Sequence, residues 1–466
     1  MTYYLFDTRI VDQVEGVQSG LGKVQKHPAN PLFGEDQPWE VRFDNLYANV
    51  LYDDDGLFKC WYSPFTIDHA TTETPKAQRH PGSYVARLQE ARTRYSSAAR
   101  EMGVCYATSV DGITWTKPAL EIIEFNGSRA NNLVMRYAHG NGIFKDRHAA
   151  DPAERYKMVL YHEETRRMMV AWSPDGLHWS SPLHCPAIEF PRRDNPGNPI
   201  IWMGDTHNNA LWAPTLASYV LITRMWRREP HRRLVGRAAS ADFRQWSAAQ
   251  PIFEGQDAND QIYAMPIFAY GDLYLGLPMI FHAGLDTVDC ELAWSPDTIH
   301  WHRLCAGTPL IPRGGAGSYD SGCIYAAATP VVVGDEIHLY YGGNNNRHTD
   351  WRDGYFCLAT LPRDRFAGLA TTTPTATGVI TTQPLLCTGN QLSINADASQ
   401  GRLRVAVVGQ PQRQMDDCQP LIGDLRHGQV IWQNGQSLAP LRGQRIRLRF
   451  ELQSATLFAF TFHDAQ

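Results

Sequence analysis

The stretch SPDGLHW (173–179) is repeated along the chain, and the spacing of its copies decides which fold we expect. Related copies are SVDGITW (109–115), SADFRQW (240–246) and SPDTIHW (295–301). Their Ser positions are 64, 67 and 55 residues apart. A period of this length indicates a repeat architecture in which each copy belongs to one structural unit.

Each copy follows short β-rich runs separated by turn residues, and long segments with helical periodicity are scarce. Three such runs, the motif and a further strand (ALEII at 119–123, PIF at 251–253) make a four-stranded unit. Four-stranded units around an axis form a β-propeller. A fifth unit with a degenerate motif fits residues 319–361. We therefore expect a five-bladed β-propeller.

The domain division follows from a break in this pattern. ATTTPTATG (370–378) is a Thr/Pro-rich segment that predicts a linker. We assign residues 1–370 to the propeller, including an N-terminal extension (1–39) and a partly helical, lid-like insertion (64–101). This insertion is either a lid that encloses substrate or a tolerated surface insertion. The short alternating runs of 379–466 predict a C-terminal antiparallel β-sandwich, so the fold class is all-β.

The Asp residues of the motif are poor candidates for catalysis. Asp and Gly favour a tight turn, the Ser hydroxyl caps it, and the Trp packs between blades. Because propeller strands alternate in direction, the motif turn lies opposite the face that gathers the strand entrances. We expect Asp111, Asp175, Asp242 and Asp297 to clip turns.

Composition excludes several classes of partner and site. The net charge is −5, without blocks of like charge, which argues against nucleic acid or an anionic membrane. No apolar run approaches the ~18–20 residues of a membrane span, and the N-terminus has no signal-peptide pattern, so we expect a cytoplasmic protein. The nine Cys are scattered, so we expect reduced thiols and neither a metal nor a cofactor.

We expect the active site on the face of the propeller opposite the motif turns. The residues before the first strand of each unit lie on this face, as do the turns between second and third strands. The candidate catalytic residues are Asp44, Asp205 and Glu163. The candidate substrate-binding residues are Asn45, His207, Arg224, Asp260, Gln261 and Asp320. A funnel with several carboxylates suits glycosidic bond cleavage, in which one carboxylic acid protonates the leaving oxygen and a carboxylate attacks the sugar or activates water.

The chain resembles the five-bladed propeller glycosidases of glycoside hydrolase families 32 and 43, and bacterial family-32-like glycosyl hydrolases with a C-terminal sandwich. The resemblance rests on KHPANPLF (26–33), PWEVRFDNLYANVLYDDDGLFKCWYSPF (38–65) and YDSGCIYAAATPVVVGDEIHLYYGG (319–343). It implies a small furanoside or related carbohydrate as substrate, with Asp44 as nucleophile or general base. The second unit has HGNG where those families carry an acidic residue, and the third offers Asp205.

Three functions stay open at this point. A glycoside hydrolase would use Asp44 with Asp205 or Glu163 as the general acid. A non-catalytic carbohydrate-binding propeller would lack one carboxylate, as the second unit does. A sugar phosphorylase would need a basic cluster around phosphate, for which Arg224, Arg227, Arg347 and Arg352 are available.

Overall fold

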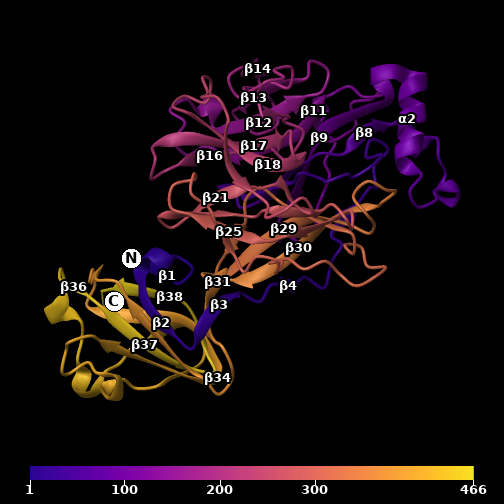
Figure 1. Ribbon diagram of the computed structural model, residues 1–466. Coiled ribbons are helices and arrows are strands. Elements are labelled where there is room, and N and C mark those ends of the chain that lie inside the picture. Colours follow the sequence, from indigo (N-terminus) through magenta and orange to yellow (C-terminus); the bar gives the residue numbers. More distant parts are fainter. Residues whose placement is uncertain (465–466) are drawn as a thin grey trace.

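The computed structural model describes residues 1–464, and the chain forms a large lobe and a smaller C-terminal lobe (Figure 1). Both lobes consist almost entirely of antiparallel strands. The expected all-β class with a propeller-like arrangement of sheets is confirmed. The C-terminal β-sandwich stays a prediction. No helix within residues 1–464 is long and apolar enough to cross a membrane.

The large lobe is built from successive antiparallel groups of strands. The first two groups are β6 (Asn49–Tyr52), β7 (Phe58–Tyr62), β9 (Arg100–Ser109) and β10 (Leu133–Arg136), and then β11 (Ala138–Lys145), β12 (Tyr156–His162), β13 (Arg167–Ser173) and β14 (Leu183–His184). The third contains β15 (Ile200–Trp202), β16 (Asn209–Ala213), β17 (Ser218–Arg227), β18 (Arg232–Ser240) and β19 (Gln250–Glu254).

The following groups are interrupted by bends. These strands are β20 (Asp260–Ala264), β21 (Ile267–Tyr270), β22 (Leu273–Gly276), β23 (Met279–His282), β24 (Thr287–Cys290), β25 (Leu292–Ser295) and β26 (His302–Leu304). The last are β27 (Cys323–Ala326), β28 (Val331–Val333), β29 (Glu336–Asn344) and β30 (Gly354–Pro362), whose open edge pairs with β4 (Gln25–Lys26) and β5 (Phe33–Gly34).

In the large lobe, one strand of each group lies beside a strand of the next group. β6 contacts β11 and β28, β11 contacts β16, and β16 contacts β21. The count of five blades stays a prediction, since the sheet of β20, β23 and β24 continues through a parallel bridge into β27 and β29. Of the two fourth strands we predicted, PIF lies in β19, whereas ALEII is not a strand and β10 takes that place.

The repeated motif stabilises turns through local hydrogen bonds, as expected. In the second copy, Asp175 Oδ1 accepts hydrogen bonds from the backbone N–H groups of Leu177 and His178, both at 2.8 Å, and from Ser173 Oγ at 3.0 Å. The Trp179 indole donates to the Gly176 carbonyl at 3.0 Å. The other three copies repeat this Asp–backbone and Trp–backbone pattern.

The residue after each motif Asp has a positive φ. It is Gly in two copies (Gly112, Gly176), and Phe243 and Thr298 in the others. The left-handed conformation costs Gly little and other residues more. The hydrogen bonds of the neighbouring Asp therefore hold Phe243 and Thr298 in a conformation that their own side chains disfavour.

The inserted segment is partly helical, as predicted. It contains β8 (Phe65–Asp68), α1 (His69–Thr72) and α2 (Tyr84–Tyr95), with α2 at the edge of the large lobe in Figure 1. The Trp351 indole donates to Ser83 Oγ at 2.8 Å, so the segment docks on the turn between β29 and β30. Its function as a lid stays a prediction.

The small lobe is a nine-stranded sheet with a two-stranded accessory, and it packs around buried side chains such as Trp432 and Phe450. Its strands are β31 (Ala367–Thr371), β32 (Thr377–Thr382), β33 (Leu385–Leu386), β34 (Gln391–Val407), β35 (Leu421–Gln429), β36 (Arg445–Ile446), β37 (Leu448–Gln453) and β38 (Thr456–His463).

The N-terminus belongs to the small lobe. β1 (Thr2–Tyr4) pairs with β38, β2 (Val11–Glu15) with β32, and β3 (Val17–Leu21) with β31. Figure 1 shows these indigo strands among the yellow ones. The sequence assigns residues 1–39 to the propeller, whereas β1, β2 and β3 pair within this sheet. The predicted linker at 370–378 overlaps β31 and β32. The domain limits stay a prediction.

Candidate functional site

Asp44 and Asn45 lie just before β6 and share one cation. Arg352 donates from Nη2 to Asp44 Oδ1 at 2.5 Å and to Asn45 Oδ1 at 3.0 Å. Arg42 approaches the same Asp44 oxygen at 3.5 Å. Burial by itself raises the pKa of Asp44, but the charges of Arg352, Arg42 and Arg100 outweigh it and hold the pKa well below its usual value. Asp44 is therefore ionised at neutral pH.

The backbone after Asn45 is strained. Leu46 and Tyr47 have φ angles of 62° and 46°, a region that non-glycine residues rarely occupy. The buried Tyr47 hydroxyl lies 2.7 Å from Asn45 Nδ2, and the Tyr47 ring lies between His139 and His207, with centroids 5.7 and 5.4 Å away. Such strain is concentrated at functional sites in proteins.

His139 of β11 joins two of the predicted catalytic carboxylates. Its Nδ1 lies 3.1 Å from Glu163 Oε1 and its Nε2 lies 2.8 Å from Asp205 Oδ1. The Nε2 contact is an ion pair without good hydrogen-bond alignment. Burial alone would lower the pKa of His139, but the charges and hydrogen bonds of Asp205 and Glu163 raise it to about 10. The ring is an imidazolium at neutral pH.

The two carboxylates that contact the His139 ring differ in their exposure to solvent and in their other hydrogen bonds. Glu163 also accepts a hydrogen bond from the Met102 N–H at 2.7 Å, and its side chain is 19% exposed. The Asp205 side chain is 58% exposed. Desolvation raises the pKa of Asp205, but the His139 charge and then that of Arg224 lower it further than that. Asp205 is the most exposed of the three candidate catalytic carboxylates.

His207 lies beneath these groups. It is buried, and burial lowers its pKa to about 3, so its ring is neutral. Its Nε2 lies 3.4 Å from Asn49 Oδ1, and Asn49 in turn donates to Asn141 Oδ1 at 3.0 Å. This layer supports Tyr47 from below. Binding of substrate by His207 stays a prediction.

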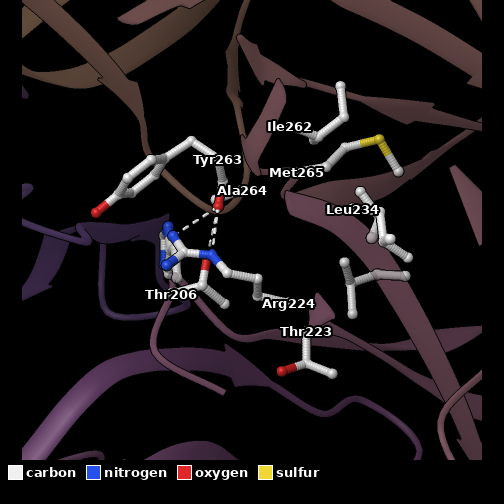
Figure 2. A pocket seen from close by; sticks show the side chains of 11 residues that line it. Thr206, Thr223, Arg224, Leu234, Ile262, Tyr263, Ala264 and Met265 are labelled. Atoms are coloured by element: carbon white, nitrogen blue, oxygen red, sulfur yellow. Dashed lines mark hydrogen bonds between the residues drawn. The ribbon is translucent and has the colours of Figure 1, made fainter. Parts of the chain in front are cut away.

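Arg224 of β17 and Gln261 of β20 lie on the third side of the site. Arg224 donates from Nη2 and Nε to the Tyr263 carbonyl at 2.8 and 3.1 Å, and it lines a narrow pocket between β17, β18 and β20 (Figure 2). The pocket space of about 170 Å³ is below the ~300 Å³ of small-molecule sites. This apolar gap is therefore too small for a sugar, and substrate binding by Arg224 and Gln261 stays a prediction.

Asp260 and Asp320 are not brought together with the other candidates. Asp260 Oδ2 pairs with Arg303 at 2.5 Å. Asp320 is buried and accepts from Lys26 Nζ at 2.5 Å and from Tyr341 Oη at 3.0 Å. These contacts hold strands together, so we leave both carboxylates out of the proposed site.

The sequence analysis missed several site residues. They are Arg42, Tyr47, Arg100, Arg233 and Tyr263. One signal was available: in MWRREPHRR (225–233), Trp226 and Arg233 are equally far from the turn, and they face each other across β17 and β18. The four arginines that the sequence offered for a phosphate site do not share one set of partners. Arg227 pairs with Glu254 at 2.8 Å, whereas Arg352 contacts Asp44.

No cluster of three His, Cys, Asp or Glu side chains suited to a metal ion occurs within residues 1–464. The nine Cys are all free thiols, of which Cys305 alone is not buried.

Several solved structures resemble the chain. An N-acetylgalactosamine deacetylase from F. plautii is 12% identical, with 76% of this chain and 97% of that chain covered and a TM-score of 0.46. A structure from the GH130 family of mannoside phosphorylases, described as containing glycoside hydrolases that target β-1,2 mannosidic linkages in Candida mannan, is 15% identical over 73% and 94%, with a TM-score of 0.45. A glycosyl hydrolase from Bacteroides ovatus is 14% identical over 73% and 94%, with a TM-score of 0.45.

Similarity at this level does not identify the reaction. No protein-family model matches the chain, and no curated protein is similar to it in sequence. Membership of glycoside hydrolase families 32 or 43 stays a prediction.

Proposed function

We propose that the chain is a glycosidase-type enzyme that cleaves a glycosidic bond between Asp44 and Asp205. The observation that carries the proposal is a difference between two carboxylates. Asp44 is fixed by Arg352 and Arg42, whereas Asp205 is exposed and backed by a protonated His139. Glycosidic cleavage needs two carboxyl groups in different environments.

Asp44 acts as the nucleophile or general base. Its pKa is held low by the neighbouring guanidinium groups, so it remains an anion over the physiological pH range. Arg352 contacts Oδ1, which leaves Oδ2 for the anomeric carbon or for an attacking water. The two hydrogen bonds that Arg352 makes to Asp44 and Asn45 orient the carboxylate.

Asp205 and His139 together supply the proton to the leaving oxygen. The pair holds one proton at neutral pH, on His139 in the free protein. As the glycosidic C–O bond breaks, negative charge develops on the leaving oxygen, and the proton passes from His139 through Asp205 to that oxygen. Water then supplies the hydroxyl of the new reducing end. Glu163 positions His139 through its Nδ1 atom.

The substrate class is a furanoside or a related linkage, as the sequence resemblance implies. A panel of aryl furanosides and pyranosides, assayed with the purified full chain, tests the function. We expect turnover of at least one substrate, and a loss of about 100- to 10,000-fold in Asp44→Asn. The matched control is Asp297→Asn, which removes a motif carboxylate engaged with Ile299 and His300 of its own turn.

Two outcomes contradict the proposal. Full activity of Asp44→Asn would show that Asp44 takes no part in the reaction. Sugar binding by the wild type without turnover of any substrate would favour the non-catalytic carbohydrate-binding propeller.

A further inference from the structure

Two arginines on facing strands of the site have no carboxylate partner. Arg224 of β17 is 4% exposed and donates only to the Tyr263 carbonyl. Arg233 of β18 donates from Nη1 to Gln261 Oε1 at 3.0 Å. Within residues 1–464 neither guanidinium is within ion-pair distance of an Asp or Glu. Buried charges are normally paired, because desolvation is costly.

Two other arginines of the same hairpin are paired with a carboxylate. Arg227 and Arg232 reach Glu254 at 2.8 and 3.2 Å. Arg228 donates to backbone carbonyls and Arg237 to Thr298 Oγ1. Glu254 therefore serves only the two arginines nearest to it.

The two inner arginines lie against the same aromatic ring. The guanidinium carbons of Arg224 and Arg233 are 4.3 and 5.5 Å from the ring centroid of Tyr263. Arg233 also stacks on Trp226 at 4.5 Å and on Phe281 at 4.7 Å. Burial lowers the pKa of Arg233 to about 10, and the positive charge of Arg224 contributes to the shift. The two cations repel each other in this arrangement.

The pair faces the proposed catalytic groups. Asp205 interacts electrostatically with both guanidinium groups without contacting either. The His348 ring lies 4.7 Å from that of Tyr263. Burial, together with the charges of Arg352, Arg233 and Arg224, holds the pKa of His348 well below its usual value, so this ring is neutral beside the three guanidinium groups. Figure 2 shows the Arg224 guanidinium at the end of its side chain remote from Leu234 and Met265. Arg224 and Arg233 thus place two positive charges on one ring, within electrostatic range of Asp205.

We propose that Arg224 and Arg233 bind an oxyanion carried by the sugar substrate, such as a uronate carboxylate or a phosphate ester. This inference rests on the proposed glycosidase function and names its substrate class. A guanidinium group presents parallel N–H donors that match the two oxygens of a carboxylate or phosphate. A bound oxyanion neutralises the repulsion between the two arginines and places the sugar beside Asp205.

Free phosphate has the same chemistry and is the other source of the oxyanion. A phosphate oxygen would then attack the anomeric carbon in place of water. The glycosidic C–O bond breaks, the leaving oxygen takes the proton from the Asp205–His139 pair, and the products are a sugar 1-phosphate and an alcohol.

Calorimetric titration of the full chain distinguishes these sources. The probes are D-glucuronate with D-glucose, D-galacturonate with D-galactose, and inorganic phosphate. We expect at least one acid sugar to bind tenfold or more tightly than its neutral counterpart. The preference should fall at least tenfold in Arg233→Gln and persist in the matched control Arg227→Gln. Phosphate binding that raises aryl-glycoside turnover in wild type, and not in Arg233→Gln, identifies the free oxyanion.

Some results overturn the inference. Equal affinity for acid and neutral sugars without phosphate binding, or equal losses in Arg233→Gln and Arg227→Gln, would contradict it. Thermal unfolding shows whether Arg233→Gln is folded, and Arg233→Lys retains the charge without the paired donors if it is not. Because binding is measured without turnover, an inactive chain that prefers acid sugars contradicts only the proposed function. An active chain without that preference contradicts only this inference.

Discussion

The Nε2 atom of His139 lies 2.8 Å from Oδ1 of Asp205, so a protonated imidazole supports the most exposed carboxylate of the site. The two residues come from different units of the large lobe, β11 and the segment before β16. Their contact couples the ionisation of one to that of the other.

The first prediction concerns the proton on His139. Its pKa is raised to about 10 in the folded chain, from 6.5 for a free imidazole. Folding therefore gains stability from protonated His139 below pH 6.5, and this gain is lost as the pH rises through about 10. We expect the His139 imidazole resonance to show no titration between pH 6 and about 8. A midpoint near 6.5 would show that the ion pairs are absent in solution.

The second prediction separates Asp205 from Glu163. We expect Asp205→Asn to lower kcat by about 100- to 10,000-fold for substrates with poor leaving groups and far less for activated aryl glycosides, because the latter need no protonation. Glu163→Gln should lower kcat less and shift the alkaline limb of the pH profile to lower pH, since His139 loses one of its two anions. Equal losses on both kinds of substrate would exclude Asp205 from proton delivery.

The third prediction concerns Glu35, which accepts hydrogen bonds from Phe43 N–H at 2.6 Å and Gly354 N–H at 3.3 Å beside the Asp44 segment. Burial raises its pKa to about 7, from 4.5. The folded state then binds more protons than the unfolded state, so this group makes stability fall as the pH rises from 4.5 through 7.

Glu35→Gln retains the acceptor oxygen and removes the ionisable group, so stability no longer falls at this site as the pH rises. We expect the variant to exceed the wild type at pH 8 by on the order of 2 kcal/mol in free energy of unfolding, and to gain little at pH 5. Urea denaturation at the two pH values provides the comparison. A variant that is less stable at both would show that the charged form of Glu35 is required.

The fourth prediction concerns the repeated motif. Asp175→Ala removes the acceptor for two backbone N–H groups, and we expect a loss of about 1–2 kcal/mol in stability. Turnover should be unchanged at temperatures where the variant is folded, because the motif turn and the turn carrying Glu163 lie at opposite ends of β13. A folded variant with reduced kcat would place the motif in the reaction.

Part of the site could be predicted because strand alternation determines which turns share a face. Asp44, Asp205 and Glu163 were selected on that ground, and His139 contacts two of them. Asp260 and Asp320 have similar positions in sequence, but Oδ2 of Asp260 pairs with Arg303 and Oδ2 of Asp320 with Lys26. Lys26 is 294 residues from Asp320 in the chain, and no local pattern reveals such a partner.

The same distinction applies to the fold. The sequence by itself determined the repeated turns, because the hydrogen bonds that Ser173, Asp175 and the Trp179 indole make within SPDGLHW join residues at most three positions apart. Tertiary structure alone decided that the N-terminal strands complete the C-terminal sheet, where Val11 faces Thr382. It also decided that Arg224 and Arg233 remain without a carboxylate while Arg227 and Arg232 share Glu254. Local hydrogen bonds can be read from neighbouring residues, whereas pairing between distant strands and the balance of buried charge depend on which surfaces the folded chain brings together.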